Sequence, residues 1–344
     1  MKISKIINSV IISTLILLFG LLNYNCDIKV GVLGYPQEIF VVADSLLWNE
    51  VGPEITEVFE TPVYTPISEP SFSVQWIPLK GLNDFKDRQN VFLIGVANED
   101  NPTTDYLKNI LPTEIQTGVE NDLNFYFFSD NLYAHGQINL FLYAKDRNTF
   151  IQRFNQYKED AFSEFSKRYY QRLSEDMFKT AEQKDLEQLI LEKYGWKIRI
   201  QHDYFIATQN ISQKYIWLRR MDPDRWISIW EMDGDSSDLN LDTLIDVREQ
   251  FLGEYYEGDR VDRDETYLMN VQFSGHQASK VVGIWQNDSL LVGGPFRTYA
   301  FLDSVTSKIY YVDIAVMAPN KQKKPYLDQL EVIANTFEII SKEK

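Results

Sequence analysis

Cysteine is almost absent from this 344-residue chain, which contains a single one, Cys26. One thiol cannot form an internal disulfide, and it cannot build a zinc site from several cysteines. The folded part must therefore be stabilised by its core alone. Hydrophobic residues make up 44 % of the chain and charged residues 24 %, which is the ordinary balance of a globular protein.

Histidine is also scarce, and common hydrolase signatures are missing. His135, His202 and His276 are far apart in the chain, and no H-x-x-x-H, G-x-S-x-G or H-E-x-x-H motif occurs. A zinc centre needs ligands that converge, often at short spacing, and standard hydrolases carry such motifs. We therefore expect no metal and no cofactor. A hydrolase site that combines His276 with Ser274 and a nearby acidic residue stays open as the alternative.

Basic residues are outnumbered by acidic ones. The chain has 34 Lys and Arg against 50 Asp and Glu, a net charge of −16. Without Lys2 and Lys5, which lie in the N-terminal segment, the balance becomes 32 to 50, or −18. A surface of this charge repels phosphate backbones, so nucleic acid is excluded as an expected partner.

The N-terminal segment has the layout of an export signal. Lys2 and Lys5 precede an apolar run from Ile6 to Leu22, and these 17 residues fall short of a full membrane span. A basic start, an apolar centre and a processing position are typical of a cleaved signal peptide. We predict a signal segment at residues 1–25, followed by a tether at residues 26–37.

Cys26 stands where the lipid-bearing cysteine of a bacterial lipoprotein would stand. The prediction is cleavage before Cys26 and attachment to membrane lipid through this thiol, with acyl chains such as palmitate. Asp27 and Ile28 begin no acidic run, so we expect the cell envelope, at the periplasmic face of the outer membrane. The residues Asn23–Asn25 depart from the usual lipoprotein box. The alternative is an uncleaved anchor helix with an incidental cysteine.

Hydrophobic patterns predict alternating strands and helices along the rest of the chain. Strands are expected at residues 38–43, 71–79, 90–98, 123–130, 137–145, 196–210 and 214–233, and as a set within 267–319. Helices are expected at residues 44–60, 104–111, 146–178, 185–195, 241–252 and 324–340. Strands of the second half follow one another without intervening helices, which favours antiparallel pairing. The predicted fold class is α+β, with two mainly antiparallel sheets covered by helices, after the N-terminal lipoprotein signal segment.

The length of the chain suffices for two domains. The two units are expected to meet near Phe178–Leu186, because the segment "SEDMFKTAEQKD" (Ser174–Asp185) is charged, contains no glycine and lacks an apolar period. We predict an N-terminal α+β domain at residues 38–180 and a C-terminal α+β domain at residues 181–344.

Tryptophan and arginine gather in the predicted strands of the second half. Trp226 and Trp230 are four residues apart in one strand and therefore share a face, and Arg219 and Arg225 lie close in sequence. Such a face could stack sugar rings or bind a peptide carboxylate, which makes these four residues the candidate binding site. The alternative is that the tryptophans fill the core between the sheet and its helices.

One loop is rich in aspartate. Residues 232–242 place Asp233, Asp235, Asp238 and Asp242 around Gly234. Oxygen-rich loops can hold Ca²⁺, but the glycine and the late glutamate of an EF-hand are missing here. The favoured interpretation is a turn in which Asp235, Ser237 or Asp238 caps the helix at residues 239–252.

Several short motifs carry a resemblance to a known family. They are "EIFVVADSLLW", "SEPSF", "RQNVFLI", "YIWLRR", "GGPFRTYAF" and "APNKQKKPYLDQLE". With these the chain resembles, over residues 38–340, uncharacterised lipoproteins of Bacteroidetes-type bacteria, a family defined as a domain of unknown function. It departs from the family pattern at Val292, where methionine is expected. The closing strands and helix are also similar to the PsbP/Mog-type fold. The resemblance to the family carries over no catalytic residue, and the similarity to the PsbP/Mog-type fold implies a binding or assembly role.

Two classes of function are therefore considered. The favoured one is a non-enzymatic envelope lipoprotein that binds an envelope protein or a small ligand. The alternative is a tethered periplasmic hydrolase with a site near His276 and the acidic loop. A broad aromatic or polar surface would favour binding, whereas a cleft with converging titratable groups would favour catalysis.

Overall fold

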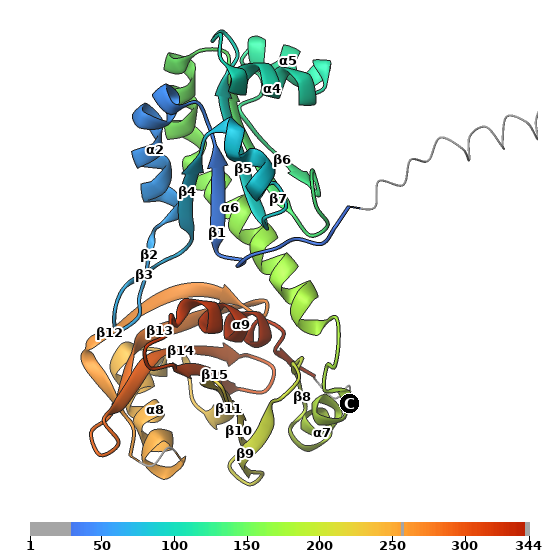
Figure 1. Cartoon of the computed structure of the whole chain (residues 1–344). Coiled ribbons are helices and arrows are strands. Elements are labelled where there is room, and N and C mark those ends of the chain that lie inside the picture. Colours follow the sequence, from blue (N-terminus) through green and yellow to red (C-terminus); the bar gives the residue numbers. More distant parts are fainter. Residues whose placement is uncertain (1–28, 256–257, 341–344) are drawn as a thin grey trace, which may run out of the picture.

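The structure is a computed structural model that describes residues 29–255 and 258–340. Cys26, the signal segment and their predicted processing lie outside the described residues. Within the described ranges, no helix has both the length and the apolar character needed to cross a membrane. The chain forms an N-terminal lobe and a C-terminal lobe (Figure 1).

The N-terminal lobe is built on a five-stranded sheet with the order β4-β1-β5-β7-β6. Its strands are β1 (Glu38–Val42), β4 (Ser73–Ile77), β5 (Asn90–Val96), β6 (Tyr126–Asp130) and β7 (Ile138–Ala144). Its helices are α2 (Ser45–Phe59), η1 (Leu79–Gly81), α3 (Leu82–Phe85), α4 (Pro102–Ile110), α5 (Thr113–Glu120) and α6 (Arg147–Phe178). The short strands β2 (Pro62–Val63) and β3 (Glu69–Pro70) form a small hairpin of their own.

Strand pairing in this sheet differs from the sequence-based expectation. β1 pairs in parallel with both β4 and β5, β5 pairs in parallel with β7, and β6 is the antiparallel member. For this sheet the prediction of mainly antiparallel pairing is wrong. The reason is that α2 and α3 carry the chain back to the starting end of the sheet before β4 and β5, and the antiparallel strand β6 does so before β7. β5 and β7 are buried along their whole length, as parallel strands covered on both faces are.

Helices cover both faces of the N-terminal sheet. Buried residues of α2 and α6 share one core cluster with the sheet, and buried residues of α4 and α5 share another. Each of these two helices begins after an aspartate that caps it. The Asp44 carboxylate accepts from the Leu46 amide, and the Asp146 carboxylate accepts from the Thr149 amide.

The C-terminal lobe contains a seven-stranded sheet with the order β12-β13-β14-β15-β11-β10-β9. Its strands are β9 (Phe205–Asn210), β10 (Tyr215–Arg220), β11 (Asp224–Asp233), β12 (Arg260–Phe273), β13 (His276–Asn287), β14 (Val292–Asp303) and β15 (Lys308–Met317). All neighbouring pairs in it are antiparallel. Antiparallel pairing is confirmed here, and so is the α+β class of the whole chain.

Helices also cover this second sheet on both faces. The helices are α7 (Lys184–Tyr194), η2 (Ser236–Asp238), α8 (Leu241–Tyr255) and α9 (Lys324–Ala334). α8 packs on one face, and α7 and α9 pack on the other. α9 is shorter than the predicted helix at residues 324–340, because β16 (Glu338–Ile339) leaves the helix to pair with β8 (Trp196–Lys197).

Each sheet takes its strands from one half of the chain. Within the described residues, no strand of the five-stranded sheet pairs with a strand of the seven-stranded sheet. Residues 179–183 connect α6 to α7 between the lobes. The division of the chain into domains at residues 38–180 and 181–344 stays a prediction, because strand pairing does not show whether the two parts fold independently.

The connection between α6 and α7 contains a strong ion pair. Arg199 donates from Nε and Nη2 to the Glu182 carboxylate over 2.6 and 3.1 Å, and Lys184 Nζ lies 2.7 Å from it. The bond to Arg199 lowers the pKa of Glu182 to about 2, against an ordinary value of 4.5. The Glu182 side chain is largely shielded from solvent, with 12 % of its surface exposed.

This pair gives a pH-dependent prediction. Because the folded pKa is depressed, the stability that Glu182 contributes is present above pH 4.5 and is lost as the pH falls toward 2. Glu182→Gln should lower the free energy of unfolding by about 1.5–3 kcal/mol at pH 7. Urea titrations at pH 7, 4 and 3 should show the difference from wild type shrinking. A difference that stays constant with pH would contradict this account.

Candidate functional site in the cleft between the lobes

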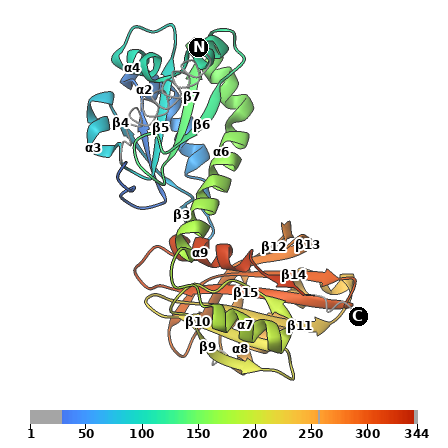
Figure 2. The same cartoon turned by 90° about the vertical axis from the view of Figure 1, so that its right-hand side faces the viewer.

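The two lobes meet where α6 lies against α9 (Figure 2). Asp328 of α9 is the centre of this contact. Its carboxylate accepts from Tyr169 Oη over 2.6 Å and from Tyr170 Oη over 2.9 Å, both on α6. Burial and the nearby carboxylate raise the pKa of both tyrosines, so their hydroxyls stay protonated and act as donors. These bonds tie the N-terminal lobe to the C-terminal lobe.

Lys324 completes the same cluster. Its ammonium bonds to the Asp328 carboxylate one helical turn away, and the residue is 5 % exposed. The ammonium also lies over the rings of Phe72, at 5.1 Å, and Tyr169, at 5.2 Å, which belong to the N-terminal lobe. A buried cation is stable where a carboxylate and aromatic faces replace its hydration shell.

Glu69 makes a third connection between the lobes. It lies in the β2–β3 hairpin of the N-terminal lobe, and its carboxylate accepts from the backbone amides of Lys323 and Lys324 over 2.8–2.9 Å. These amides begin α9, so the glutamate supplies the cap that the helix lacks in its own sequence. An acidic side chain from one lobe therefore fixes the start of a helix in the other.

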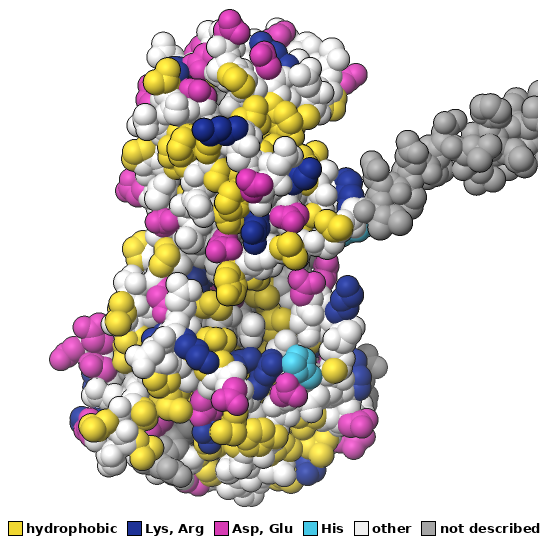
Figure 3. All heavy atoms as spheres, viewed as in Figure 1, with side chains coloured by type: hydrophobic (Ala, Val, Ile, Leu, Met, Phe, Trp, Pro, Cys, Tyr) yellow, Lys and Arg dark blue, Asp and Glu magenta, His cyan; other side chains and the backbone are white. Residues whose placement is uncertain are grey.

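A cleft of about 600 Å³ lies beside these contacts. In the space-filling view the molecule narrows and is hollowed between its lobes (Figure 3). The N-terminal lobe lines the cleft with the start of β1 and the β3–β4 segment, and the C-terminal lobe lines it with the first turns of α9. Its polar and aromatic lining includes Tyr35, Gln37, Gln322, Tyr326 and Gln329. The cleft therefore offers amide groups for hydrogen bonds and rings for stacking.

Arg225 lies directly behind the C-terminal wall of the cleft. Its Nη2 donates to Gln329 Oε1 over 3.2 Å, and its guanidinium lies 5.3 Å from the centre of the Tyr326 ring. Nη1 donates to the Pro223 carbonyl over 2.9 Å. The residue is 3 % exposed, so its charge is enclosed by protein.

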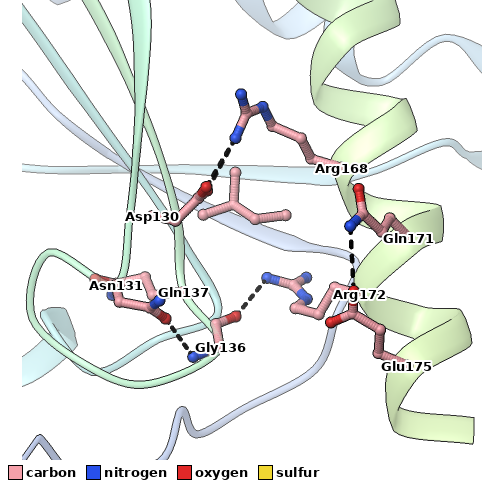
Figure 4. A pocket seen from close by; sticks show the side chains of 9 residues that line it. Asp130, Asn131, Gly136, Gln137, Arg168, Gln171, Arg172 and Glu175 are labelled. Atoms are coloured by element: carbon pink, nitrogen blue, oxygen red, sulfur yellow. Dashed lines mark hydrogen bonds and ion pairs between the residues drawn. The ribbon is translucent and has the colours of Figure 1, made fainter.

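A smaller pocket of about 210 Å³ lies on the N-terminal lobe, between α6 and the β6–β7 turn (Figure 4). Arg168 pairs with Asp130 there, whereas Arg172 is buried and donates to the carbonyls of Gln89 and Gly136 and to Asn90 Oδ1. Burial lowers the pKa of Arg172 to about 10. These bonds attach α6 to the amino ends of β5 and β7, which is a structural role.

The predicted tryptophan face is covered by α8. Trp226 is 4 % exposed and Trp230 is 1 % exposed, and both pack in one cluster with Leu244, Ile245 and Phe251. Trp230 also stacks on Tyr311, with ring centres 5.0 Å apart. The shared face of the two tryptophans is as expected, but it is part of the core. Packing between the sheet and α8, which is the alternative stated from the sequence, accounts for the positions of both tryptophans.

The two candidate arginines lie on opposite faces of the sheet. Arg219 is the cross-strand neighbour of Trp226, and its Nε donates to Asp224 over 2.7 Å. Arg225 precedes Trp226 in the strand, so it points toward α9 and the cleft. The four predicted site residues therefore do not form one surface, and Arg225 is the one that reaches the cleft wall.

The acidic loop makes local caps. Asp235 accepts from the Ser237 amide and, together with Asp238, forms a capping box on η2. Asn240, rather than an aspartate, caps α8 by accepting from the Thr243 amide. The predicted capping of this helix by Asp235, Ser237 or Asp238 is therefore wrong by a few residues. In the ranges that the structure covers, no group of three or more His, Cys, Asp and Glu side chains could hold a metal ion.

The residues of the hydrolase alternative have other contacts. Ser274 donates to the Phe337 carbonyl, and the His276 ring stacks on Phe301 at 4.3 Å. His202 bonds to its neighbour Asp203 over 2.6 Å, on a different strand connection. These contacts serve packing and turn geometry in the C-terminal lobe.

The sequence reading missed the residues that join the lobes. Lys324 and Asp328 form a visible i,i+4 pair, and Tyr169 and Tyr170 lie in the predicted long helix. No pattern in the sequence near Asp328 indicated its contacts with Tyr170 and Tyr169, which lie 158 and 159 residues earlier in the chain. Glu69 gave no signal either, because it caps a helix of the other lobe.

Comparisons with known proteins match each lobe to a separate family. Residues 32–178 match the model of a domain of unknown function, DUF8532, and residues 183–336 match that of another, DUF4837. Each model covers less than half of the chain. The comparison with curated proteins found no match.

Similar solved structures include LpqN, described as involved in cell envelope biogenesis of Mycobacterium tuberculosis. It is 15 % identical, with a TM-score of 0.27, and the match covers 42 % of this chain and 83 % of LpqN. The Ran-binding protein Mog1p of Saccharomyces cerevisiae is 11 % identical, with a TM-score of 0.28, covering 42 % of this chain and 90 % of Mog1p. Scores this low carry no argument about function.

Proposed function

We propose that this protein is a non-enzymatic binding module of the cell envelope, tethered through Cys26, that holds a small ligand in the cleft between its lobes. The observation that carries the proposal is the cleft of about 600 Å³, which both lobes line with amide and aromatic side chains. Ligand sites occur preferentially at junctions between structural units and combine aromatic surface with a few polar groups.

The charged groups at the cleft favour binding over hydrolysis. The Glu69 carboxylate is occupied by two backbone amides, and the Lys324 ammonium is occupied by Asp328. The Glu38 carboxylate, which also lines the cleft, accepts from the Tyr35 backbone amide. A general base or nucleophile must be within hydrogen-bond reach of its substrate. Here Glu69 and Lys324 hold the lobes together, and the amide and aromatic side chains of the lining provide hydrogen bonds and stacking.

The tether places the cleft near its attachment point. Lys29 donates to the carbonyls of Asn131 and Leu132, and Gly31 forms a bridge with His135, so the expected tether runs along the N-terminal lobe. Tyr35, a few residues later, lines the cleft. Cys26 precedes Lys29 by three residues, which span about 10 Å at most. A lipid on Cys26 would hold the cleft close to the bilayer.

Lipidation is tested by intact mass. Wild-type protein isolated from the membrane fraction of a bacterial host should begin at Cys26 and carry acyl chains, whereas Cys26→Ser should lack them and leave the membrane. Masses that differ by the substitution alone would contradict the tether and would leave the binding function to be judged separately.

Binding in the cleft is tested with a blocking variant. The panel consists of N-acetylated dipeptides with free carboxylates, the matching dipeptide amides, glucuronic acid and glucose. At least one member should raise the thermal midpoint of the wild type, because a ligand of the native state stabilises it by mass action. Ser73→Trp places a large ring at the exposed start of β4 in the cleft and should abolish the rise.

The matched control is Ser163→Trp, which puts the same ring on an exposed position of α6 that is outside the cleft lining. It should respond as the wild type does. A panel without effect on the wild type, or an equal response from Ser73→Trp, would contradict the proposed function. Conversion of a panel member to a product would support the hydrolase alternative instead.

A further inference from the structure

Arg225 is a buried cation of the C-terminal lobe for which no ion pair with a carboxylate is described, and it shares this property with Arg297, which donates to the carbonyls of Phe296 and Tyr64. Arg248 pairs with Asp313, and Lys324 pairs with Asp328. Arg225 donates instead to two neutral oxygens, the Pro223 carbonyl and Gln329 Oε1. Its Nε has no hydrogen-bond partner in the described part of the chain. A guanidinium that is 3 % exposed is normally neutralised, because burial removes its hydration.

The surroundings of Arg225 add further positive charge and a further donor. Arg220 is its direct cross-strand neighbour and donates to the neutral Gln201 Oε1 over 2.6 Å. Arg220 Nη2 also lies 3.6 Å from Oδ2 of Asp203, and the Asp203 side chain is 68 % exposed. Tyr204, 3 % exposed on the same side of the sheet, lies beside Arg225, and burial raises the pKa of its hydroxyl although the charge of Arg225 opposes this rise. Arg225 and Arg220 therefore place two positive charges side by side, and the carboxylate described as paired with them is the exposed one of Asp203.

The cleft provides the route to this region. Gln329 and Tyr326 line the cleft on one side and contact Arg225 on the other. Gln329 is partly exposed, so its side chain can turn into the cleft and release Nη2 of Arg225. The amide oxygen of Gln329 thus occupies the place that an oxygen of a ligand would take.

We propose that Arg225 recognises a carboxylate on the ligand of the cleft, with Arg220 as a second positive charge and the ring of Tyr326 beside the ligand. The planar guanidinium matches a carboxylate with two parallel hydrogen bonds, which a neutral amide cannot form. The inference rests on the proposed binding function and names its ligand class, a small molecule with a carboxylate. A peptide terminus and a sugar acid share this chemistry.

The test compares two glutamine variants in calorimetric titrations with the panel defined above. Gln329→Glu supplies an internal carboxylate to Arg225 and should weaken binding of the acids roughly tenfold or more, the effect of losing hydrogen bonds to a charged group. Gln152→Glu adds the same charge at an exposed position of α6 that is outside the cleft lining. It should retain most of the affinity. Gln329→Glu should also raise the thermal midpoint without ligand, which shows that the variant is folded.

The panel separates the outcomes. Binding of dipeptide acids but not their amides identifies a peptide terminus, whereas binding of glucuronic acid but not glucose identifies a sugar acid. If neutral members bind the wild type as well as the acids do, and Ser73→Trp abolishes this, the binding function stands and the carboxylate inference is wrong. Equal binding of the acids to Gln329→Glu and wild type would also overturn the inference. Failure of every member to bind would overturn both.

Discussion

Asp328→Ala is expected to lower the free energy of unfolding by about 3–5 kcal/mol, because it removes the carboxylate that compensates a buried ammonium. Lys324 would remain 5 % exposed without its partner, and the hydroxyls of Tyr169 and Tyr170 would lose their acceptor. The two lobes should then unfold in separate transitions. Urea titration followed by tryptophan fluorescence and by circular dichroism should give two transitions at different urea concentrations.

The control removes both charges together. Lys324→Met with Asp328→Leu should recover much of the loss, since well-packed apolar residues can replace a buried ion pair at little cost. A loss below about 1 kcal/mol for Asp328→Ala, the usual value of an exposed pair, would show that the cluster is not a buried connection between the lobes.

Asp313→Ala should have a comparable effect inside the C-terminal lobe, again about 3–5 kcal/mol. Arg248 of α8 donates from Nε and Nη2 to Asp313 of β15 over 2.7 and 3.2 Å, and their side chains are 2 % and 1 % exposed. Thr298 adds a hydrogen bond of 2.5 Å to the same carboxylate. Loss of the carboxylate would leave a guanidinium buried against the ring of Phe296.

Two further variants separate charge from packing at this pair. Asp313→Asn keeps a similar shape and one acceptor but removes the charge, so it should be destabilised nearly as much as Asp313→Ala. Thr298→Val removes one neutral donor and should cost about 1 kcal/mol. Thermal or urea unfolding that ranks Thr298→Val as the most damaging of the three would contradict the charge-based account.

Much of the local structure could be predicted from the sequence, because short-range physics determines it. The caps at Asp44 and Asp146 follow from side-chain oxygens that bond free helix amides. Gly195 ends α7 in the left-handed conformation, with φ of 81°, which is the conformation that a glycine commonly adopts directly after a helix. The strand β11 places Trp226 and Trp230 on one face by its period of two.

Contacts between distant segments could not be predicted in the same way. Whether neighbouring strands of the N-terminal sheet are parallel depends on the end of the sheet to which the connecting helices lead the chain. The hydrophobic pattern of a strand does not determine this. The burial of Trp230 depends on α8 covering its face, which the strand alone does not reveal. Of the residues predicted for binding, Arg225 is the one that lies next to the cleft, and its role in binding stays a prediction. Its position behind the cleft wall depends on α9, about one hundred residues later in the chain.

Amide hydrogen exchange of the wild-type protein tests the central claim most directly, which is that the cleft between the lobes is the binding site. Exchange is measured with and without the panel member that most raises the thermal midpoint. Residues 35–38, 69–73 and 322–329, which contain most of the cleft lining, should exchange more slowly with the ligand bound. The exposed turn at residues 288–291, which is outside the cleft lining, should be unchanged. Unchanged exchange in all three cleft segments, or protection confined to other parts of the chain, would contradict the account.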